Sequence, residues 1–142
     1  MQTIPVSPSM QWLDLSRLPI GNAAVQRLVP APERLEQLNL EATKIDSALG
    51  TWLRKAANLN EVDLSWTSAG DEVIESLGGA LKITTLWMTG TQISDQSVVP
   101  ILKMPDLKSV DVQRTRVSVA GVEQLKTSSS QLDVNPLELR TQ

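Results

Sequence analysis

The feature that most constrains the fold of this chain is an apolar pattern that returns every 24 residues. One copy contains Ile83, Leu86, Met88, Thr91 and Ile93, and the next contains Leu107, Val110, Val112, Thr115 and Val117 at the same spacings. The pattern recurs upstream from Leu59 and from Leu35. A looser copy starts at Met10, and a partial one runs from Leu132 to Leu139. Periods of roughly 20–29 residues with this frame are typical of stacked strand-plus-helix units.

The pattern predicts one repeat domain at residues 10–142 after an extended lead-in at residues 1–9. Repeats start near 10, 35, 59, 83 and 107, and a partial repeat covers 129–139. We expect strands at 12–15, 37–40, 61–64, 85–88, 109–112 and 131–134. Helices are expected at about 22–28, 47–57, 71–77, 96–102 and 119–126. The fourth helix should be short or 3₁₀-like, because Pro100 has no N–H to donate.

Each predicted unit can cover its apolar side chains only by stacking on its neighbours. A buried helical position recurs as Leu53, Leu77, Ile101 and Leu125. Stacking places all strands in one parallel sheet and all helices on the opposite face. Because helices are wider than strands, the stack should curve with the sheet inside. The predicted fold class is therefore an α/β right-handed solenoid, or horseshoe, with the sheet on its concave face and short helices on its convex face.

Polar positions at the ends of the strands and helices support this frame. A threonine recurs at the ninth position as Thr43, Thr67, Thr91 and Thr115. Buried backbone groups must be paired, so we expect these hydroxyls to bind main-chain atoms where each strand turns towards its helix. Asp46 or Ser47 is suited to cap the second helix, and Ser94 or Asp95 the fourth.

Composition excludes several classes of function. The chain has no His and no Cys, which removes disulfides, thiol nucleophiles, His-based acid–base chemistry and the usual zinc sites. The net charge of −3 argues against general affinity for nucleic acid. Residues 1–9 carry no Lys, no Arg and no long apolar run, so neither a signal peptide nor a membrane span is predicted. A cytoplasmic location and no cofactor are expected, although a protein without Cys is also compatible with secretion.

The step Thr91-Gln92-Ile93-Ser94-Asp95 resembles leucine-rich repeat proteins. It is similar to the 24-residue repeats common in bacteria, which are themselves similar to the cysteine-containing subfamily with Thr in place of Cys. The resemblance covers about Met10 to Leu139 and implies a protein-binding scaffold. Two departures stand out: Ser68-Ala69 replaces a β-branched residue, and neither end has a family-type capping helix.

The third, fifth, seventh and eighth positions of each repeat are expected to face the concave side. These columns hold six carboxylates and two arginines, a charge of −4, while the other ionised side chains sum to +1. They also hold Trp12, Trp66 and Trp87, and Trp is enriched among interface anchors. The predicted partner is a protein of basic or mixed charge. The candidate protein-binding residues are Asp14, Asn39, Glu41, Glu61, Asp63, Trp66, Thr85, Trp87, Asp111, Gln113, Arg114 and Asp133.

Alternative explanations exist for several of these residues. The recurring Asp-Leu-Ser at Asp14–Ser16 and Asp63–Ser65 is also explained by repeat ancestry. Trp12 could instead be covered by residues 1–9, and Trp52 is expected to pack between convex segments. Asp111 and Asp133 are predicted as lateral neighbours, roughly 4.8 Å apart, where two carboxylates can share a proton or bind a cation.

Neither catalysis nor a metal site is predicted, because an open sheet without His offers nothing to activate a substrate. The favoured function is a non-catalytic protein-interaction module. The alternative is a structural or assembly unit, either a fragment of a longer repeat array or an end-to-end homo-oligomer. Its uncapped ends would then be covered by further copies, since an exposed sheet edge favours aggregation.

Overall fold

The computed structural model describes residues 11–78, 82–129 and 131–134. The predicted lead-in, and the end of the partial repeat from residue 135 onward, lie outside the described residues. The strands are β1 (Trp12–Asp14), β2 (Gln37–Asn39), β3 (Glu61–Asp63), β4 (Thr85–Trp87), β5 (Ser109–Asp111) and β6 (Asp133–Val134). The α-helices are α1 (Asn22–Leu28), α2 (Gly50–Leu53), α3 (Asp71–Leu77), α4 (Val98–Leu102) and α5 (Val119–Ser128).

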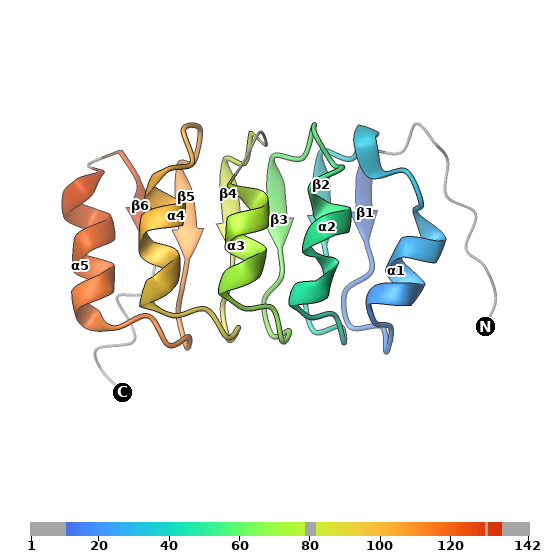
Figure 1. The fold of residues 1–142 in the computed structure, drawn as a ribbon, viewed down its shortest axis with the longest axis horizontal. Coiled ribbons are helices and arrows are strands. Elements are labelled where there is room, and N and C mark those ends of the chain that lie inside the picture. Colours follow the sequence, from blue (N-terminus) through green and yellow to red (C-terminus); the bar gives the residue numbers. More distant parts are fainter. Residues whose placement is uncertain (1–10, 79–81, 130, 135–142) are drawn as a thin grey trace.

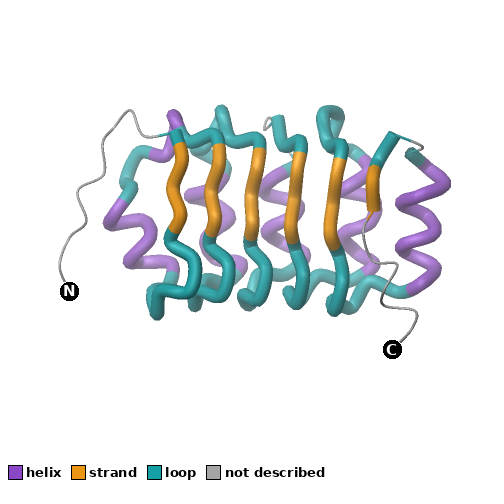
Figure 2. Tube along the Cα trace, turned by 180° about the vertical axis from the view of Figure 1, so that it is seen from behind, coloured by secondary structure: helices purple, strands orange, loops and turns teal. Residues whose placement is uncertain are grey.

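All six strands form one parallel sheet in the order β1-β2-β3-β4-β5-β6. The register pairs each residue with the one 24 positions further along, except between β1 and β2, where the step is 25. The helices line up along one face of the sheet, and the other face carries none in the described residues (Figures 1 and 2). The prediction of an α/β fold with a single parallel sheet and helices on one side is therefore confirmed. We call the helix-free side the open face.

The hydrophobic core lies between the sheet and the helices. The second residue of every strand is buried, as are the recurring helical residues Leu53, Leu77, Ile101 and Leu125. Trp52 packs on the helical side as predicted, only 3% exposed, and its indole N–H donates to the carbonyl of Val29 at 2.7 Å. Each buried Leu or Val stabilises the fold by about 1.5–3 kcal/mol relative to an exposed one.

Helix positions agree with the prediction at α1 and α3, and differ at α2. A 3₁₀ turn, η2 (Ser47–Leu49), precedes α2, which ends at Leu53 and not near residue 57. The reason is the hydrogen-bond pattern: the N–H groups of Lys55 and Ala56 donate to carbonyls three residues back, so the helix tightens and stops. The helix containing Pro100 is short and follows the 3₁₀ turn η3 (Asp95–Ser97), as predicted. A further 3₁₀ turn, η1 (Pro32–Arg34), was not predicted.

The recurring threonines close the end of four strands, as predicted. The hydroxyls of Thr43, Thr67, Thr91 and Thr115 donate to the carbonyls of Leu40, Leu64, Met88 and Val112 at 2.8, 2.6, 2.7 and 2.7 Å. Each hydroxyl thereby pairs with a main-chain oxygen at the point where the strand turns towards its helix.

Polar side chains at the helix starts tie each segment to the next. Asp46 caps η2 by accepting from Ala48 N–H, and it also exchanges hydrogen bonds with Asn22 in the preceding segment. Asp71 accepts from the N–H and the hydroxyl of Ser94 at 2.8 and 2.7 Å. Asp95 does the same for the N–H and hydroxyl of Ser118. First-turn carboxylates are favoured here by the helix dipole.

Candidate binding surface on the open face

Two rows of side chains cross the open face, because the first and third residues of a strand point to the same side of a sheet. The first row is Trp12, Gln37, Glu61, Thr85, Ser109 and Asp133, and the second is Asp14, Asn39, Asp63, Trp87 and Asp111. Neighbours within a row are register partners, roughly 4.8 Å apart. The structure thus brings most of the predicted binding residues onto one surface.

The predicted pairing of Asp111 with Asp133 is wrong. Asp133 is the register partner of Ser109, and Val134 is the partner of Val110. The apolar pair Leu132 and Val134 suggested that Gln131 would pair with Ser109, but the register that forms is shifted by two residues. Leu132 is nevertheless buried, just before the strand. The last strand therefore offers no lateral carboxylate pair.

The second row, which contains three aspartates, has a structural role that its charge alone did not reveal. Oδ1 of Asp14, Asn39, Asp63 and Asp111 accepts the N–H two residues further on at 2.9, 2.9, 2.9 and 3.0 Å. This Asx turn bends the chain at the end of the strand. Hydrogen bonds from the side chain and the N–H of Ser16 lower the pKa of Asp14. Only Trp87 breaks the pattern within the row.

The predicted seventh and eighth positions lie in the turns that follow the strands, beyond the rows of the open face. Glu41 and Gln113 are half-buried there, and Arg114 is exposed. The backbone is left-handed at every eighth position described: Arg17, Ala42, Trp66, Gly90 and Arg114 have φ of 65°, 58°, 60°, 71° and 56°. A left-handed backbone is unfavourable for a bulky residue such as Trp.

Trp66 accordingly belongs to a turn, and it packs on the turn of the next segment. Its side chain is half exposed, and its ring lies against Gly90. A methyl group on Gly90 would come within 2.3 Å of Cε3 of Trp66. The ring can adopt this position only because residue 90 has no side chain.

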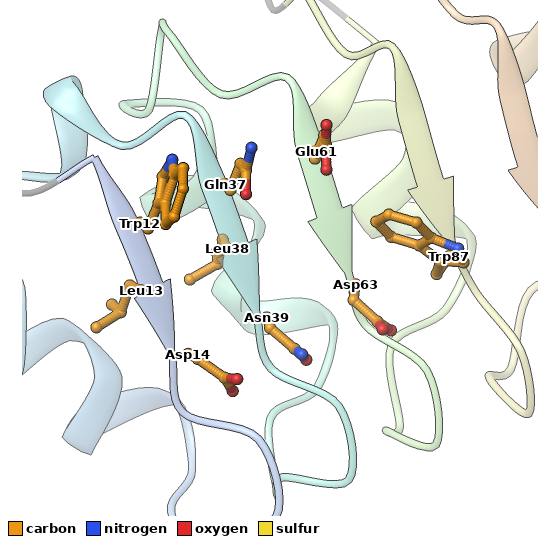
Figure 3. Close-up of a pocket in the computed structure, with 9 residues that line it drawn as sticks. All are labelled: Trp12, Leu13, Asp14, Gln37, Leu38, Asn39, Glu61, Asp63 and Trp87. Carbon is orange, nitrogen blue, oxygen red and sulfur yellow. The ribbon is translucent and has the colours of Figure 1, made fainter.

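Trp12 and Trp87 flank a shallow groove of about 450 Å³ on the open face (Figure 3). Trp12 is 68% exposed and Trp87 is 37% exposed. Polar side chains of β2 and β3 stand between the two indoles. The residues that line this tryptophan groove are Trp12, Leu13, Asp14, Gln37, Leu38, Asn39, Glu61, Asp63 and Trp87.

The groove is negatively charged. Asp14, Glu61 and Asp63 line it, and its lining contains no Lys or Arg. Arg17, in the turn after β1, is 3.9 Å from the carboxylate of Glu41. A concave surface lined by charge of one sign concentrates ligands of the opposite sign. The groove therefore favours a cationic ligand that can also cover aromatic surface.

Within the described part of the chain, no group of three or more acidic side chains is placed to hold a metal ion. None of the helices in this part is both long enough and apolar enough to cross a lipid bilayer.

No protein-family model matches the chain, and no curated protein matches its sequence.

Proposed function

We propose that the chain is a right-handed solenoid of the leucine-rich repeat type that acts as a non-catalytic protein-interaction module through its open face. The 24-residue step of the parallel register supports this proposal. The threonine hydroxyl that closes four of the strands, β2 to β5, supports it as well. The step at Thr91–Asp95, which resembles this family, adds the sequence argument.

The observation that carries the proposed function is the pair of exposed indoles, Trp12 and Trp87, on either side of a groove lined by three carboxylates. An exposed Trp presents a large apolar surface to water, and Trp is enriched among the anchors of protein interfaces. A partner that covers both rings gains the burial of that surface. The partner class is a protein segment of basic or mixed charge.

A second candidate function is assembly through the ends of the sheet. In the described residues, β1 and β6 each pair with one strand only. Parallel edges of this kind can pair with another chain. Sedimentation analysis distinguishes this candidate, because assembly predicts a mass above that of the monomer that falls when the terminal strands are changed.

The test of the interaction function is selection from a displayed library of random peptides. The bait is the wild-type protein, and clones that also bind a Trp87→Ala variant are removed in a counter-selection. Val119→Ala serves as the control, since Val119 is 64% exposed but begins α5 on the opposite side of the sheet.

We expect clones that bind the wild type and the Val119→Ala variant but lose about tenfold or more of their affinity for Trp87→Ala, a loss typical of an interface anchor. Circular dichroism verifies that all variants are folded. Failure to recover any clone that depends on Trp87 would contradict the proposed role of the open face.

A further inference from the structure

The tryptophan groove contains two indole–carboxylate pairs at opposite corners. On β1, Asp14 follows Trp12 by two residues, so both side chains lie on the open face about 7 Å apart along the strand. On the other side, Asp63 of β3 is the register partner of Trp87 of β4, at a strand spacing of roughly 4.8 Å. Each indole therefore has a carboxylate within reach of a single long cationic side chain.

The separation of the two pairs follows from the register. Trp12 and Trp87 are three strands apart, which is roughly 14 Å across the sheet, and two residues apart along it, which is about 7 Å. The diagonal between them is thus about 16 Å. The two rings are too far apart to enclose one cation, so they form two separate sites.

The space between the two sites is lined by groups that suit a peptide backbone. Gln37 and Asn39 project from β2 and Glu61 from β3 (Figure 3). Carboxamides both donate and accept hydrogen bonds. The oxygen of Asn39 already accepts from Glu41 N–H, which directs its amide group to act as a donor. A main-chain carbonyl of a bound peptide is a suitable acceptor.

We propose that the tryptophan groove binds an extended peptide segment that carries two arginines four residues apart, one on each indole–carboxylate pair; this inference rests on the proposed interaction function. A guanidinium is planar, stacks on an aromatic face and forms bidentate hydrogen bonds with a carboxylate. In an extended chain, residues i and i+4 point to the same side and lie about 13 Å apart. The flexible arginine side chains span the remaining distance to the two rings.

The first arm of the test is a series of Ser/Thr peptides with two arginines at spacings of two, four and eight residues. Single-arginine peptides and a version with both arginines replaced by neutral citrulline serve as controls. Binding is measured by titration calorimetry at low ionic strength and again near 0.15 M salt. We expect the four-residue spacing to bind about tenfold tighter than either single-arginine peptide, because the second contact becomes intramolecular, and the citrulline version to lose binding.

The second arm uses variants that keep the backbone turn. Asp63→Asn and Asp14→Asn remove charge but preserve the Asx turn, since Asn39 makes the same turn on β2. Each should reduce the affinity of the four-residue peptide towards that of a single-arginine peptide, as should Trp12→Ala and Trp87→Ala. Trp66→Ala is the matched control, because Trp66 lies in a turn outside the groove lining.

Equal affinities for the peptides with arginine spacings of two, four and eight residues would overturn the two-site proposal. Unchanged affinity of the citrulline version would overturn it as well. The library selection separates this failure from failure of the proposed function. If the selected peptides require Trp87 but lack paired cations, the open face remains the binding surface. Only the assignment of two arginines is then contradicted. Absence of any peptide that depends on Trp87 contradicts both.

Discussion

At the scale of single residues, the ends of β1, β2, β3 and β5 are each shaped by one Asx residue followed three positions later by a left-handed residue. Asp63 and Trp66 show the pair on β3, and Asp14 and Arg17 show it on β1. The sequence displays these residues as charges and aromatic anchors, but it does not display their dihedral angles. The turn is the reason that Trp66 lies apart from Trp12 and Trp87, although all three were expected on one surface.

Gly90→Ala should destabilise the protein by about 1–2 kcal/mol, because φ at residue 90 is +71° and a left-handed backbone is unfavourable for Ala. The new methyl group would also displace the ring of Trp66. Urea denaturation measures the free energy of unfolding. The same substitution in a Trp66→Ala background isolates the effect of the backbone conformation. It should lower the free energy of unfolding by less than in the wild type. Equal costs in both backgrounds would show that the ring does not depend on Gly90.

At the scale of elements, hydrogen bonds at fixed positions join each strand and helix to the next segment. The threonine positions were predictable from spacing alone, because a buried hydroxyl next to a turning strand has few partners other than the main chain. The hydrogen bonds from Ser94 to the Asp71 carboxylate were only partly predictable. Helix caps are local signals, whereas their bonds to the next segment depend on how the helices stack.

Thr91→Val should destabilise the protein by about 1 kcal/mol, because it deletes the 2.7 Å hydrogen bond to the carbonyl of Met88 at a site that is 3% exposed. Denaturant titration gives the free energy of unfolding. Thr127→Val is the matched control, since its hydroxyl makes a similar bond to Glu123 but at an exposed position of α5. A cost at Thr127 as large as that at Thr91 would contradict a role for burial.

Stability should fall in acid partly through Asp71. Burial raises the pKa of Asp71, but the hydrogen bonds from Ser97 and Ser94 outweigh it and lower the pKa below its ordinary value. A lowered pKa means that the carboxylate stabilises the fold above its unfolded value of about 4 and loses this effect as the pH falls through the folded value.

Asp71→Asn should therefore cost about 1 kcal/mol at pH 7, because Asn cannot accept from Ser94 at both positions. It should also flatten the decline of unfolding free energy between about pH 5 and pH 2. Denaturant titrations across this range provide the measurement, with the exposed Asp106→Asn as control. An unchanged pH profile in Asp71→Asn would rule out the Asp71 carboxylate as the cause.

At the scale of the whole molecule, the sequence predicts the parallel sheet and its helical layer, because each apolar column needs a neighbour to be covered. The last strand shows where such prediction fails. Leu132 and Val134 suggested a frame two residues short of the 24-residue step, whereas that step itself pairs Asp133 with Ser109 and Val134 with Val110. The groove likewise could not be predicted from the sequence, because it depends on which side chains lie in the turns and not on the open face.

The two indoles of the tryptophan groove should bind the same ligand. Tryptophan indole N–H signals report this directly in a ¹⁵N NMR titration, after assignment by single Trp variants. Addition of the four-residue arginine peptide should shift the signals of Trp12 and Trp87 along one binding curve and leave the buried Trp52 unchanged. A shift of the Trp66 signal alone would contradict shared binding by Trp12 and Trp87. So would a titration in which neither Trp12 nor Trp87 shifts.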